Sequence, residues 1–266
     1  MKYDYQETTK DLFKRIEIHT KYGSRNIDEW MLELLPLKAG QKILDVGCGA
    51  GKQVFSFYDF LKGQVDILGA DISQELLTQA RQEKENRSAN VRFMDLDFNK
   101  TFDLPANTFD LISCCFAIYY ADDIPFTIRE MHRVLKPGGV LFTSGPMPEN
   151  KLLFYDIIKE ATGKIIPPMP GSSRYASEIY STIKNTFSDI ALDVFENHLT
   201  FESVEPFIEY TRASLSEDRK LWKSFFLDKG DFNRIMGQIE ETAKRRLAKE
   251  GKLVMTKVVG GILATK

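Results

Sequence analysis

The sequence predicts an α/β fold built on a parallel β-sheet with crossover helices, and three observations support this prediction. Between about Lys42 and Phe142, short apolar runs alternate with helix-length segments, a pattern typical of parallel strands joined by helices. The run 109–115 (FDLISCC) is apolar enough to be buried on both faces, as a central parallel strand is. With 266 residues, of which 43% are apolar and 28% charged, the chain can close its own core.

This stretch contains five expected strands and three expected helices. The strands are expected at 42–46, 65–70, 91–94, 109–115 and 140–143, and the helices at about 52–61, 73–85 and 126–135. Ser73 has the side chain of a helix N-cap. The third helix is expected to stop at the breaker cluster 136–139 (KPGG), because proline and adjacent glycines end helices.

Beyond residue 146 the pattern is less regular. Helices are expected at about 151–161 and 175–187, and the last two strands at 190–199 and 253–264. A helical block of about fifty residues separates these strands, with Ser203 expected at its N-cap and Pro206 in its first turn. Because most connections between neighbouring elements are short, we interpret this block as an insertion.

Composition argues against several classes of protein. The net charge is −2, whereas a domain that binds nucleic acid usually carries a basic stripe. The three cysteines have no CxxC spacing and the three histidines lie far apart, so no metal site is expected. No signal peptide is recognised, and the longest apolar-rich run, 111–120, is too short to span a membrane. We therefore expect a soluble, cytoplasmic protein.

The strongest motif is the run 44–51 (LDVGCGAG), in which a strand ends in glycines and leads into a helix. Glycine allows a ligand to approach the backbone and tolerates the positive φ of such a turn. This pattern indicates a nucleotide-cofactor loop. The dinucleotide fingerprint GxGxxG fails, because Lys52 occupies the place of its third glycine. Binding of NAD or FAD is therefore disfavoured.

Asp71 is the second part of the pattern. It ends the second strand, twenty residues after Gly51, where a carboxylate can accept hydrogen bonds from both ribose hydroxyls of a cofactor. A loop aspartate beside the capping Ser73 is the alternative interpretation. Because the loop and the acid occur together at the expected separation, we favour a cofactor site.

With these motifs the sequence resembles the class I S-adenosylmethionine (SAM)-dependent methyltransferases of the small-molecule type. The resemblance covers about 41–143 and rests on four blocks in order: 44–51 (LDVGCGAG), 70–73 (ADIS), 104–112 (LPANTFDLI) and 130–139 (EMHRVLKPGG). It implies a Rossmann-like sheet of seven strands with helices on both faces, the last strand lying antiparallel beside the fifth. It also implies that SAM is the cofactor and S-adenosylhomocysteine the product.

The resemblance assigns roles to individual residues. Gly47 and Gly49, with Cys48 between them, pass close to the methionine part of the cofactor, and Asp45 helps to hold the loop and the cofactor's amino group. Asp71 accepts from the ribose hydroxyls. The resemblance also implies three residues at the adenine: Ile72 packs on it, Asp97 accepts from its amino group and Phe98 flanks its ring. It implies two more after the fourth strand: Cys115 offers its backbone to the amino-acid end of the cofactor, and Phe116 faces the active site.

Two points stay open within this assignment. Asp95 is a second candidate for the acid that binds adenine. Cys115 and its neighbour Cys114 can also be ordinary buried residues.

A general base is needed only if the acceptor arrives protonated, and the candidates are His19, Tyr22 and Tyr119.

The predicted function is transfer of a methyl group to an O or N atom of a small-molecule acceptor, with no nucleic acid and no membrane as partner. Alternatives are a protein or nucleic-acid methyltransferase, a nicotinamide-dependent oxidoreductase and a non-catalytic SAM-binding module. The Asn/Asp-Pro-Pro-aromatic motif common in enzymes that methylate base amino groups is missing after the fourth strand, where the chain reads 114–120 (CCFAIYY).

The expected domains are a helical cap at 1–35, the SAM-binding core at 36–202, a helical lid insertion at 203–251 and the final core strand at 252–266. The insertion is rich in large apolar residues that must be buried against something. We predict a lid over the acceptor pocket, with the segment around His19 and Tyr22; a homodimer interface is the alternative. The residues on which this prediction rests are Phe207, Ile208, Leu221, Trp222, Phe225, Phe226 and Leu227.

Overall fold

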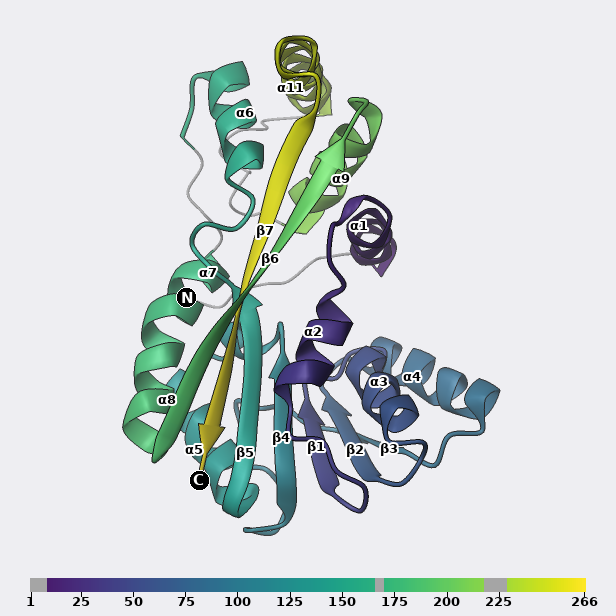
Figure 1. Cartoon of the computed structure of the whole chain (residues 1–266), viewed down its shortest axis with the longest axis vertical. Helices are drawn as coiled ribbons and strands as arrows, with labels where there is room; N and C mark the ends of the chain where they lie inside the picture. The colour runs from purple at the N-terminus through teal and green to yellow at the C-terminus, as the bar shows by residue number, and fades with distance from the viewer. Residues whose placement is uncertain (1–8, 166–169, 218–228) are drawn as a thin grey trace. The chain divides into compact units, whose positions relative to one another are not determined.

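The computed structural model describes residues 9–165, 170–217 and 229–266 (Figure 1). The helices are α1 (Thr9–Tyr22), α2 (Ile27–Leu34), α3 (Lys52–Phe60), α4 (Gln74–Arg87), α5 (Ile124–Val134), α6 (Leu152–Thr162), α7 (Pro170–Arg174), α8 (Tyr180–Thr186), α9 (Glu205–Glu217) and α11 (Lys229–Glu250), with a 3₁₀ turn η1 (Ile118–Tyr120) and a π-helical turn η2 (Tyr175–Ile179). The strands are β1 (Lys42–Val46), β2 (Asp66–Asp71), β3 (Arg92–Asp95), β4 (Phe109–Cys115), β5 (Leu135–Pro146), β6 (Asp189–Phe201) and β7 (Leu253–Thr265).

Within the described residues the strands form one seven-stranded sheet of order β3-β2-β1-β4-β5-β7-β6. The pairs β2–β3, β1–β2, β1–β4 and β4–β5 are parallel. Strand β7 lies antiparallel to β5, with Leu141 opposite Ala264. The predicted α/β fold, with its last strand reversed beside the fifth, is therefore confirmed. Parallel strands place their carboxyl ends at one edge of a sheet, where ligands bind in such folds.

The chain forms two compact units. The first contains residues 1–26, 148–170 and 196–258, and the second contains residues 27–147, 171–195 and 259–266. Strands β6 and β7 contribute residues to both. This division differs from the expected domain boundaries in two places: α2 groups with the sheet, not with a cap at 1–35, and α6 groups with α9 and α11, not with the core. Neither assignment could be made from local sequence, because both depend on packing between distant segments.

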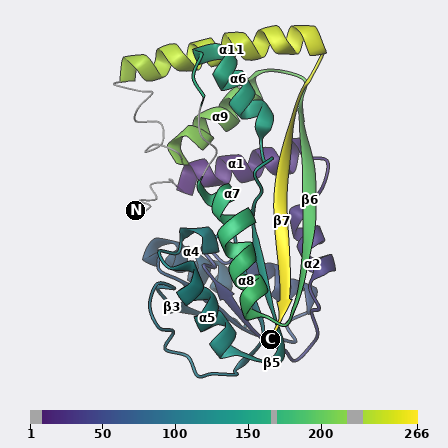
Figure 2. The same ribbon diagram turned by 90° about the vertical axis from the view of Figure 1, so that its left-hand side faces the viewer.

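In the second unit the two faces of the sheet bury separate apolar clusters. Leu44 and Ile112 belong to the cluster that includes α5, η2 and α8, whereas their neighbours Ile43 and Leu111 belong to the cluster that includes α2, α3 and α4. Successive residues of a strand point to opposite faces, so strands with apolar residues at both positions are covered on both sides. Figures 1 and 2 show these helices over the sheet.

The first unit has its own apolar core. Helices α1 and α9 pack together, as do α6 and α11, and the core includes Ile18, Phe154 and Ile239. Phe207 and Ile208 are buried in it. These two residues of the expected lid therefore already have an apolar environment within the unit. The other five residues that supported the lid prediction, at positions 221, 222 and 225–227, lie outside the described residues.

Several local signals act as the sequence predicts. The Ser73 hydroxyl accepts from the Leu76 N–H over 3.3 Å and caps α4. Pro206 lies in the first turn of α9, which begins at Glu205. The third helix ends where it is expected to, because α5 stops at Val134, but the fifth strand begins at Leu135 and not at the expected 140. Gly138 has a φ of +73°, and its N–H donates to the Lys266 carbonyl over 2.9 Å. The turn is thus held by the end of the chain.

Candidate functional site

The glycine loop follows β1 and is held by hydrogen bonds to the neighbouring strand β2. The N–H groups of Gly47 and Cys48 both donate to the Ala70 carbonyl, over 2.7 and 3.0 Å. Gly47, Gly49 and Gly51 have φ values of +72°, +54° and +86°, which residues with a side chain rarely adopt. At Gly47 a Cβ would lie 2.5 Å from the Cβ of Ala117. The loop therefore requires glycine there for both its backbone conformation and its packing.

Asp71 ties this loop to the next one. Its Oδ2 accepts from the Gly49 N–H over 2.8 Å, and its Oδ1 accepts from the Ser73 N–H over 2.8 Å. Each carboxylate oxygen can accept more than one hydrogen bond, so the half-buried side chain retains capacity for the two ribose hydroxyls that the sequence assigns to it. The structure adds an organising role that the sequence did not reveal.

Asp45 lies deeper, with 2% of its surface exposed. Its Oδ1 accepts from the Ser113 hydroxyl of the neighbouring strand β4 over 2.5 Å. Burial raises the pKa of this carboxyl to about 7, the nearby Asp71 charge adds to the increase, and the Ser113 hydrogen bond opposes it. Ser113 is a partner that sequence reasoning missed, although a serine within an apolar strand was a visible signal.

The residues expected to bind adenine follow β2 and β3. Ile72 is 60% exposed, so it can cover a flat ring. Asp97 Oδ1 accepts from the Asn99 N–H over 3.0 Å, and its Oδ2 lies 3.3 Å from Lys100 Nζ. Burial would raise the pKa of Asp97, but these contacts outweigh burial and lower it, so Asp97 is an ionised acceptor.

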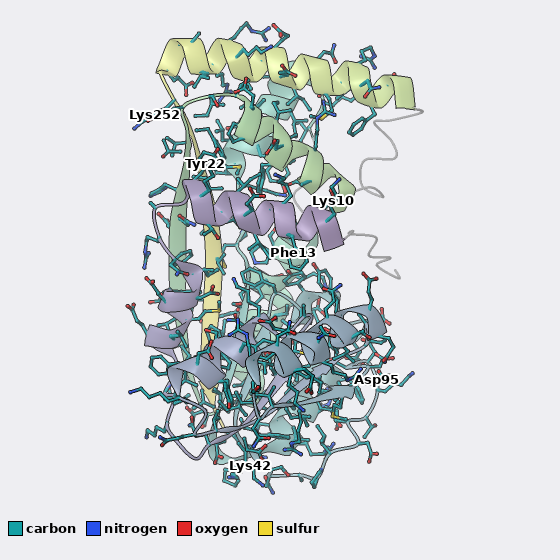
Figure 3. The ribbon with its side chains drawn as sticks, turned by 90° about the vertical axis from the view of Figure 1, so that its right-hand side faces the viewer. Lys10, Phe13, Tyr22, Lys42, Asp95 and Lys252 are labelled. Atoms are coloured by element: carbon teal, nitrogen blue, oxygen red, sulfur yellow. The ribbon has the colours of Figure 1, made fainter. Side chains whose placement is uncertain are left out.

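Asp95 and Phe98, which lie close to Asp97 in the sequence, have contacts within the chain. Asp95 lies exposed at the end of β3 (Figure 3) and accepts from Gln74 Nε2 over 2.7 Å. Asp95 therefore has a partner on α4, and it stays the second candidate for the acid that binds adenine. Phe98 is half-buried against the apolar cluster beneath the sheet, and its carbonyl accepts from the Thr127 hydroxyl over 3.0 Å.

At the end of β4 the chain turns sharply toward the glycine loop. Phe116 has a φ of +54° and its N–H donates to the Ser144 carbonyl over 2.8 Å. Its side chain is 37% exposed, consistent with the expected position facing a ligand. Burial raises the pKa of the Cys115 thiol above its usual range, and its Sγ lies 3.8 Å from the Met31 Sδ of α2. The Cys115 side chain therefore fits a packing role better than a reactive one.

The three candidates for a general base lie in different parts of the fold. Tyr119 is 6% exposed and belongs to the apolar cluster of the second unit, with the Tyr120 ring centroid 4.4 Å away. His19 and Tyr22 belong to α1 in the first unit, and Tyr22 is labelled on this helix in Figure 3. Their rings pack against Tyr210 and Phe201, with centroids 5.7 and 5.4 Å apart. Each candidate thus contributes to a core, and a catalytic role for any of them remains a prediction.

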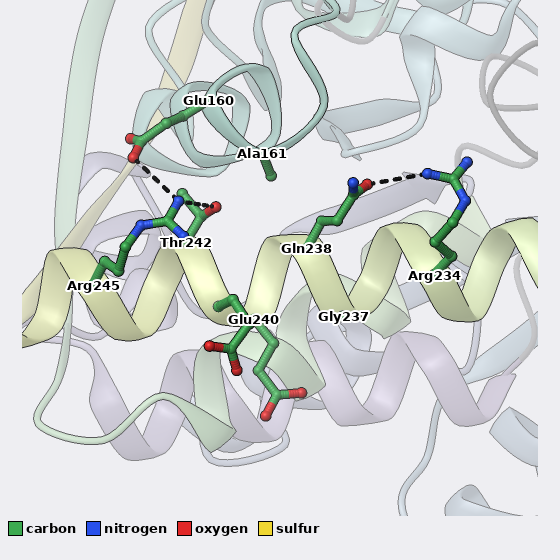
Figure 4. Close-up of a pocket in the computed structure, with 9 residues that line it drawn as sticks. Glu160, Ala161, Arg234, Gly237, Gln238, Glu240, Thr242 and Arg245 are labelled. Atoms are coloured by element: carbon green, nitrogen blue, oxygen red, sulfur yellow. Dashed lines mark hydrogen bonds and ion pairs between the residues drawn. The ribbon is translucent and has the colours of Figure 1, made fainter.

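Metal-ligand groups and membrane-spanning helices also bear on function. No group of three or more His, Cys, Asp or Glu side chains is arranged to hold a metal ion in the described part of the chain. None of the described helices has the length and apolar character needed to cross a bilayer. A hollow between α6 and α11, lined by Glu160, Arg234, Gln238 and Arg245 among others (Figure 4), lies in the first unit and contains none of the predicted site residues.

The central part of the chain is similar to known methyltransferases. Residues 43–139 match the family model described as "Methyltransferase domain". Phosphoethanolamine N-methyltransferase 3 of Arabidopsis thaliana is 38% identical over 122 residues, which are 46% of this chain and 24% of that protein. A ubiquinone/menaquinone biosynthesis C-methyltransferase of Azotobacter vinelandii is 33% identical over 156 residues, 55% of this chain and 61% of that protein. The chain thus covers less than two thirds of the length of either relative.

Solved structures share the fold at low identity. The YcgJ protein of Bacillus subtilis is 16% identical with a TM-score of 0.58, covering 90% of this chain and 97% of that one. Phosphoethanolamine N-methyltransferase 2 of Haemonchus contortus, solved with SAM, is 16% identical with a TM-score of 0.56, covering 97% and 57%. The [4+2]-cyclase SpnF is 18% identical with a TM-score of 0.53, covering 90% and 79%. The family match and the four sequence blocks identify residues 43–139 as a class I SAM-dependent methyltransferase domain, and the solved structures share its fold.

Proposed function

We propose that the protein transfers the methyl group of SAM to an oxygen or nitrogen atom of a small-molecule acceptor by in-line displacement. The observation that carries the proposal is the glycine loop held between β1 and β2 by Asp71. It joins a loop whose glycines adopt positive φ values with a carboxylate whose oxygens can still accept hydrogen bonds.

The residues present fit SAM. Glycines at positions 47, 49 and 51 give the loop its backbone conformation, Asp71 offers acceptors for a ribose, and the exposed Ile72 offers an apolar surface for a base. Lys52 stands where a dinucleotide loop would have its third glycine, which disfavours NAD. When bound, SAM supplies a methyl group that its sulfonium charge has already activated for displacement.

The chain's own task is then to position the donor and acceptor and to exclude water. Correct positioning alone can supply much of the reduction in the barrier. A proton must be removed only if the acceptor is protonated at the attacking atom. The burial of Tyr119 and the packing of His19 and Tyr22 support a mechanism that depends chiefly on positioning.

Two considerations support a small acceptor. The curated relatives named above are an N-methyltransferase of phosphoethanolamine and a C-methyltransferase of quinone biosynthesis, and the net charge of −2 disfavours a nucleic acid. A protein acceptor is a second possibility. A non-catalytic or differently catalytic SAM-binding module is a third, because a cyclase shares this fold and a fold alone does not determine the reaction.

A labelled donor tests the proposal directly. The full chain is incubated with methyl-labelled SAM and a small-molecule extract, and mass spectrometry follows labelled products and S-adenosylhomocysteine. We expect a labelled small molecule to appear in step with S-adenosylhomocysteine, and both to be lost with Asp71→Ala. If SAM binds but neither product forms in any extract, the module without methyl transfer becomes the better account. Label found only in protein or nucleic acid would reassign the acceptor class.

A further inference from the structure

The turn that follows β4, residues 116–122, packs against the glycine loop. It begins at Phe116, whose φ is +54°, and continues as the 3₁₀ turn η1. Its Ala117 leaves no room for a side chain at Gly47, because an added Cβ would lie 2.5 Å from the Cβ of Ala117. A shift of this turn would therefore change the packing of the loop that is proposed to hold the cofactor.

The same turn is joined to the loop that is expected to bind adenine. The Asp122 N–H donates to Asn99 Oδ1 over 2.7 Å. The Asn99 N–H in turn donates to Asp97 Oδ1 over 3.0 Å. The 116–122 turn thus contacts both loops of the proposed SAM site, so its position affects both of them.

An arginine from a distant segment holds this turn. Arg174 Nη1 donates to the carbonyls of Tyr119 and Ala121, over 2.9 Å in each case. The last carbonyls of a helix find no donor within it, and arginine side chains can bond such carbonyls. Arg174 lies 53 residues beyond Ala121 in the sequence, so the turn is fixed by a separate part of the chain.

The segment that carries Arg174 is anchored to the sheet and packed on the turn. Tyr175 is fully buried, and its hydroxyl donates to the Thr143 carbonyl of β5 over 2.8 Å. Gly171 lies against the Tyr119 ring, because an added Cβ there would be 2.8 Å from the ring's Cδ2. The Arg174 side chain is only 16% exposed. All these residues belong to the second unit, so the guanidinium reaches the turn from a fixed position within that unit.

Such a contact favours ligand binding through preorganisation. A loop that is already ordered loses less conformational entropy when a ligand binds, so its affinity is higher. Hydrogen bonds from a charged guanidinium are also stronger than those between two neutral groups. Two such bonds to one short turn restrict its movement relative to β4 and β5.

We propose that Arg174 is a positioning residue of the cofactor site. It holds the 116–122 turn in the place from which Ala117 supports the glycine loop and Asp122 supports the loop of Asp97. It acts through the turn and not by contact with the cofactor. The inference rests on the proposed function for the identity of the ligand, SAM.

Two arginine variants of the full chain, matched in the contacts that they remove, test this role. Arg133 is the control for Arg174, because it also donates to two backbone carbonyls, those of Leu104 and Phe102, over 2.9 and 2.8 Å, and pairs with a nearby carboxylate. Its carbonyl partners precede β4, whereas those of Arg174 follow it. Calorimetry should show SAM binding weakened by at least about threefold in Arg174→Met and unchanged in Arg133→Met, although both variants should melt at lower temperature than the wild type.

Hydrogen exchange without ligand reports on the turn itself. The N–H groups of Tyr120 and Ala121 donate to carbonyls within the turn, and Arg174→Met should speed their exchange by at least about threefold, whereas Arg133→Met should not. Glu178→Gln removes the 3.1 Å ion pair of Arg174 but keeps its contacts with the turn. Because exposed ion pairs contribute little, this variant should change neither the exchange nor the SAM affinity.

A conservative variant covers the case in which Arg174→Met does not fold. Arg174→Lys keeps the charge but loses the planar fork of donors, so its loss of SAM affinity should be smaller than that of Arg174→Met and should again accompany faster exchange of the turn.

The outcomes separate this role from a structural one and from the proposed function. Faster exchange with unchanged SAM affinity would make Arg174 purely structural, and weaker SAM binding without faster exchange would mean that it does not act through the turn; either result overturns the proposal. Equal losses of SAM affinity in Arg174→Met and Arg133→Met would overturn it too, because general stability would explain both. A wild type that does not bind SAM contradicts the proposed function and, with it, the role at the cofactor.

Discussion

The Gly49 N–H donates a hydrogen bond to Oδ2 of Asp71 over 2.8 Å, so the carboxylate that ends β2 holds the loop that follows β1. The same carboxylate binds the Ser73 N–H at the start of α4. One side chain therefore fixes the relative positions of two loops at the carboxyl edge of the sheet. In the proposed SAM site, loss of Asp71 would therefore remove both a proposed ligand contact and the support of the glycine loop.

Gly47 should not tolerate a methyl group. In Gly47→Ala the new Cβ would lie 2.5 Å from the Ala117 Cβ, and the φ of +72° adds about 1–2 kcal/mol of strain. The loop must shift to relieve the contact. We expect SAM affinity to fall by at least about tenfold, measured by calorimetry on folded protein.

Two variants separate the steric contact from the backbone strain. Gly138→Ala places alanine at a φ of +73° with no atom within 4 Å of its Cβ, so it should reduce stability and leave SAM affinity unchanged. The double variant Gly47→Ala with Ala117→Gly removes the contact and should recover part of the lost affinity. If Gly138→Ala weakens SAM binding as much as Gly47→Ala, the effect is one of general stability.

Asp45 should make stability depend on pH in a defined direction. Its folded pKa of about 7 lies above the ordinary 3.8, mainly because of burial. A carboxyl with a raised folded pKa contributes stability that is present below about pH 4 and is lost as the pH rises through about 7. Asp45→Asn lacks this loss, so it should be more stable than the wild type by about 1–4 kcal/mol near pH 8.

Denaturant unfolding of both proteins between about pH 5 and pH 8 measures this difference. The gap in free energy of unfolding should shrink toward the acid end. Wild-type SAM affinity should rise from about pH 6 to pH 7.5 as Asp45 ionises, and that of Asp45→Asn should stay flat and weaker. A stability gap independent of pH would mean that Asp45 does not change its protonation state within this range, contrary to the prediction.

Activity should not require a metal ion. Displacement at a sulfonium needs no Lewis acid, and the described residues contain no cluster with the spacing of metal ligands. Once an acceptor is known, the initial rate in the presence of a strong chelator should equal the rate without it. A loss of activity that added magnesium restores would contradict this prediction.

The predicted helical lid at 203–251 can be tested through Trp222, although this residue lies outside the described part of the chain. Trp30→Phe removes the other indole; it also removes a 2.7 Å hydrogen bond from Trp30 Nε1 to Asp193, so its folding must be checked first. Fluorescence should then respond to acceptor with S-adenosylhomocysteine and not to dilution. A signal that follows protein concentration and ignores ligand would indicate a dimer interface instead.

The sequence predicts the sheet between residues 42 and 146 closely. Strands 42–46 and 109–115 are found with their predicted limits, and the strands predicted at 65–70 and 91–94 are each shifted by one residue. Buried parallel strands are marked by local apolar runs, which is why they could be predicted. The start of the fifth strand, at Leu135 and not at the expected 140, was harder to predict, since the KPGG segment is held by Lys266 at the far end of the chain. The π-helical turn η2 has no repeating pattern that a helical periodicity would reveal.

The site was predicted in part. Gly47, Gly49 and Asp71 form a recognisable motif, and the structure brings Gly49 and Asp71 into direct contact. Ala117, which explains the requirement at Gly47, and Ser113, which binds Asp45, could not be predicted because these contacts join segments far apart in sequence. The contact of Arg174 with the turn after β4 was missed for the same reason.

Equilibrium binding of SAM and NADH to the full chain tests the central claim, that the glycine loop and Asp71 form a SAM site. Calorimetry is run on the wild type, on Asp71→Ala and on Asp66→Ala, a control on the same strand whose carboxylate pairs with Arg92 at 2.7 Å. The account predicts saturable SAM binding, a roughly ten- to hundredfold loss with Asp71→Ala, little change with Asp66→Ala and no comparable affinity for NADH. Unchanged SAM affinity in folded Asp71→Ala, or tighter binding of NADH than of SAM, would contradict it.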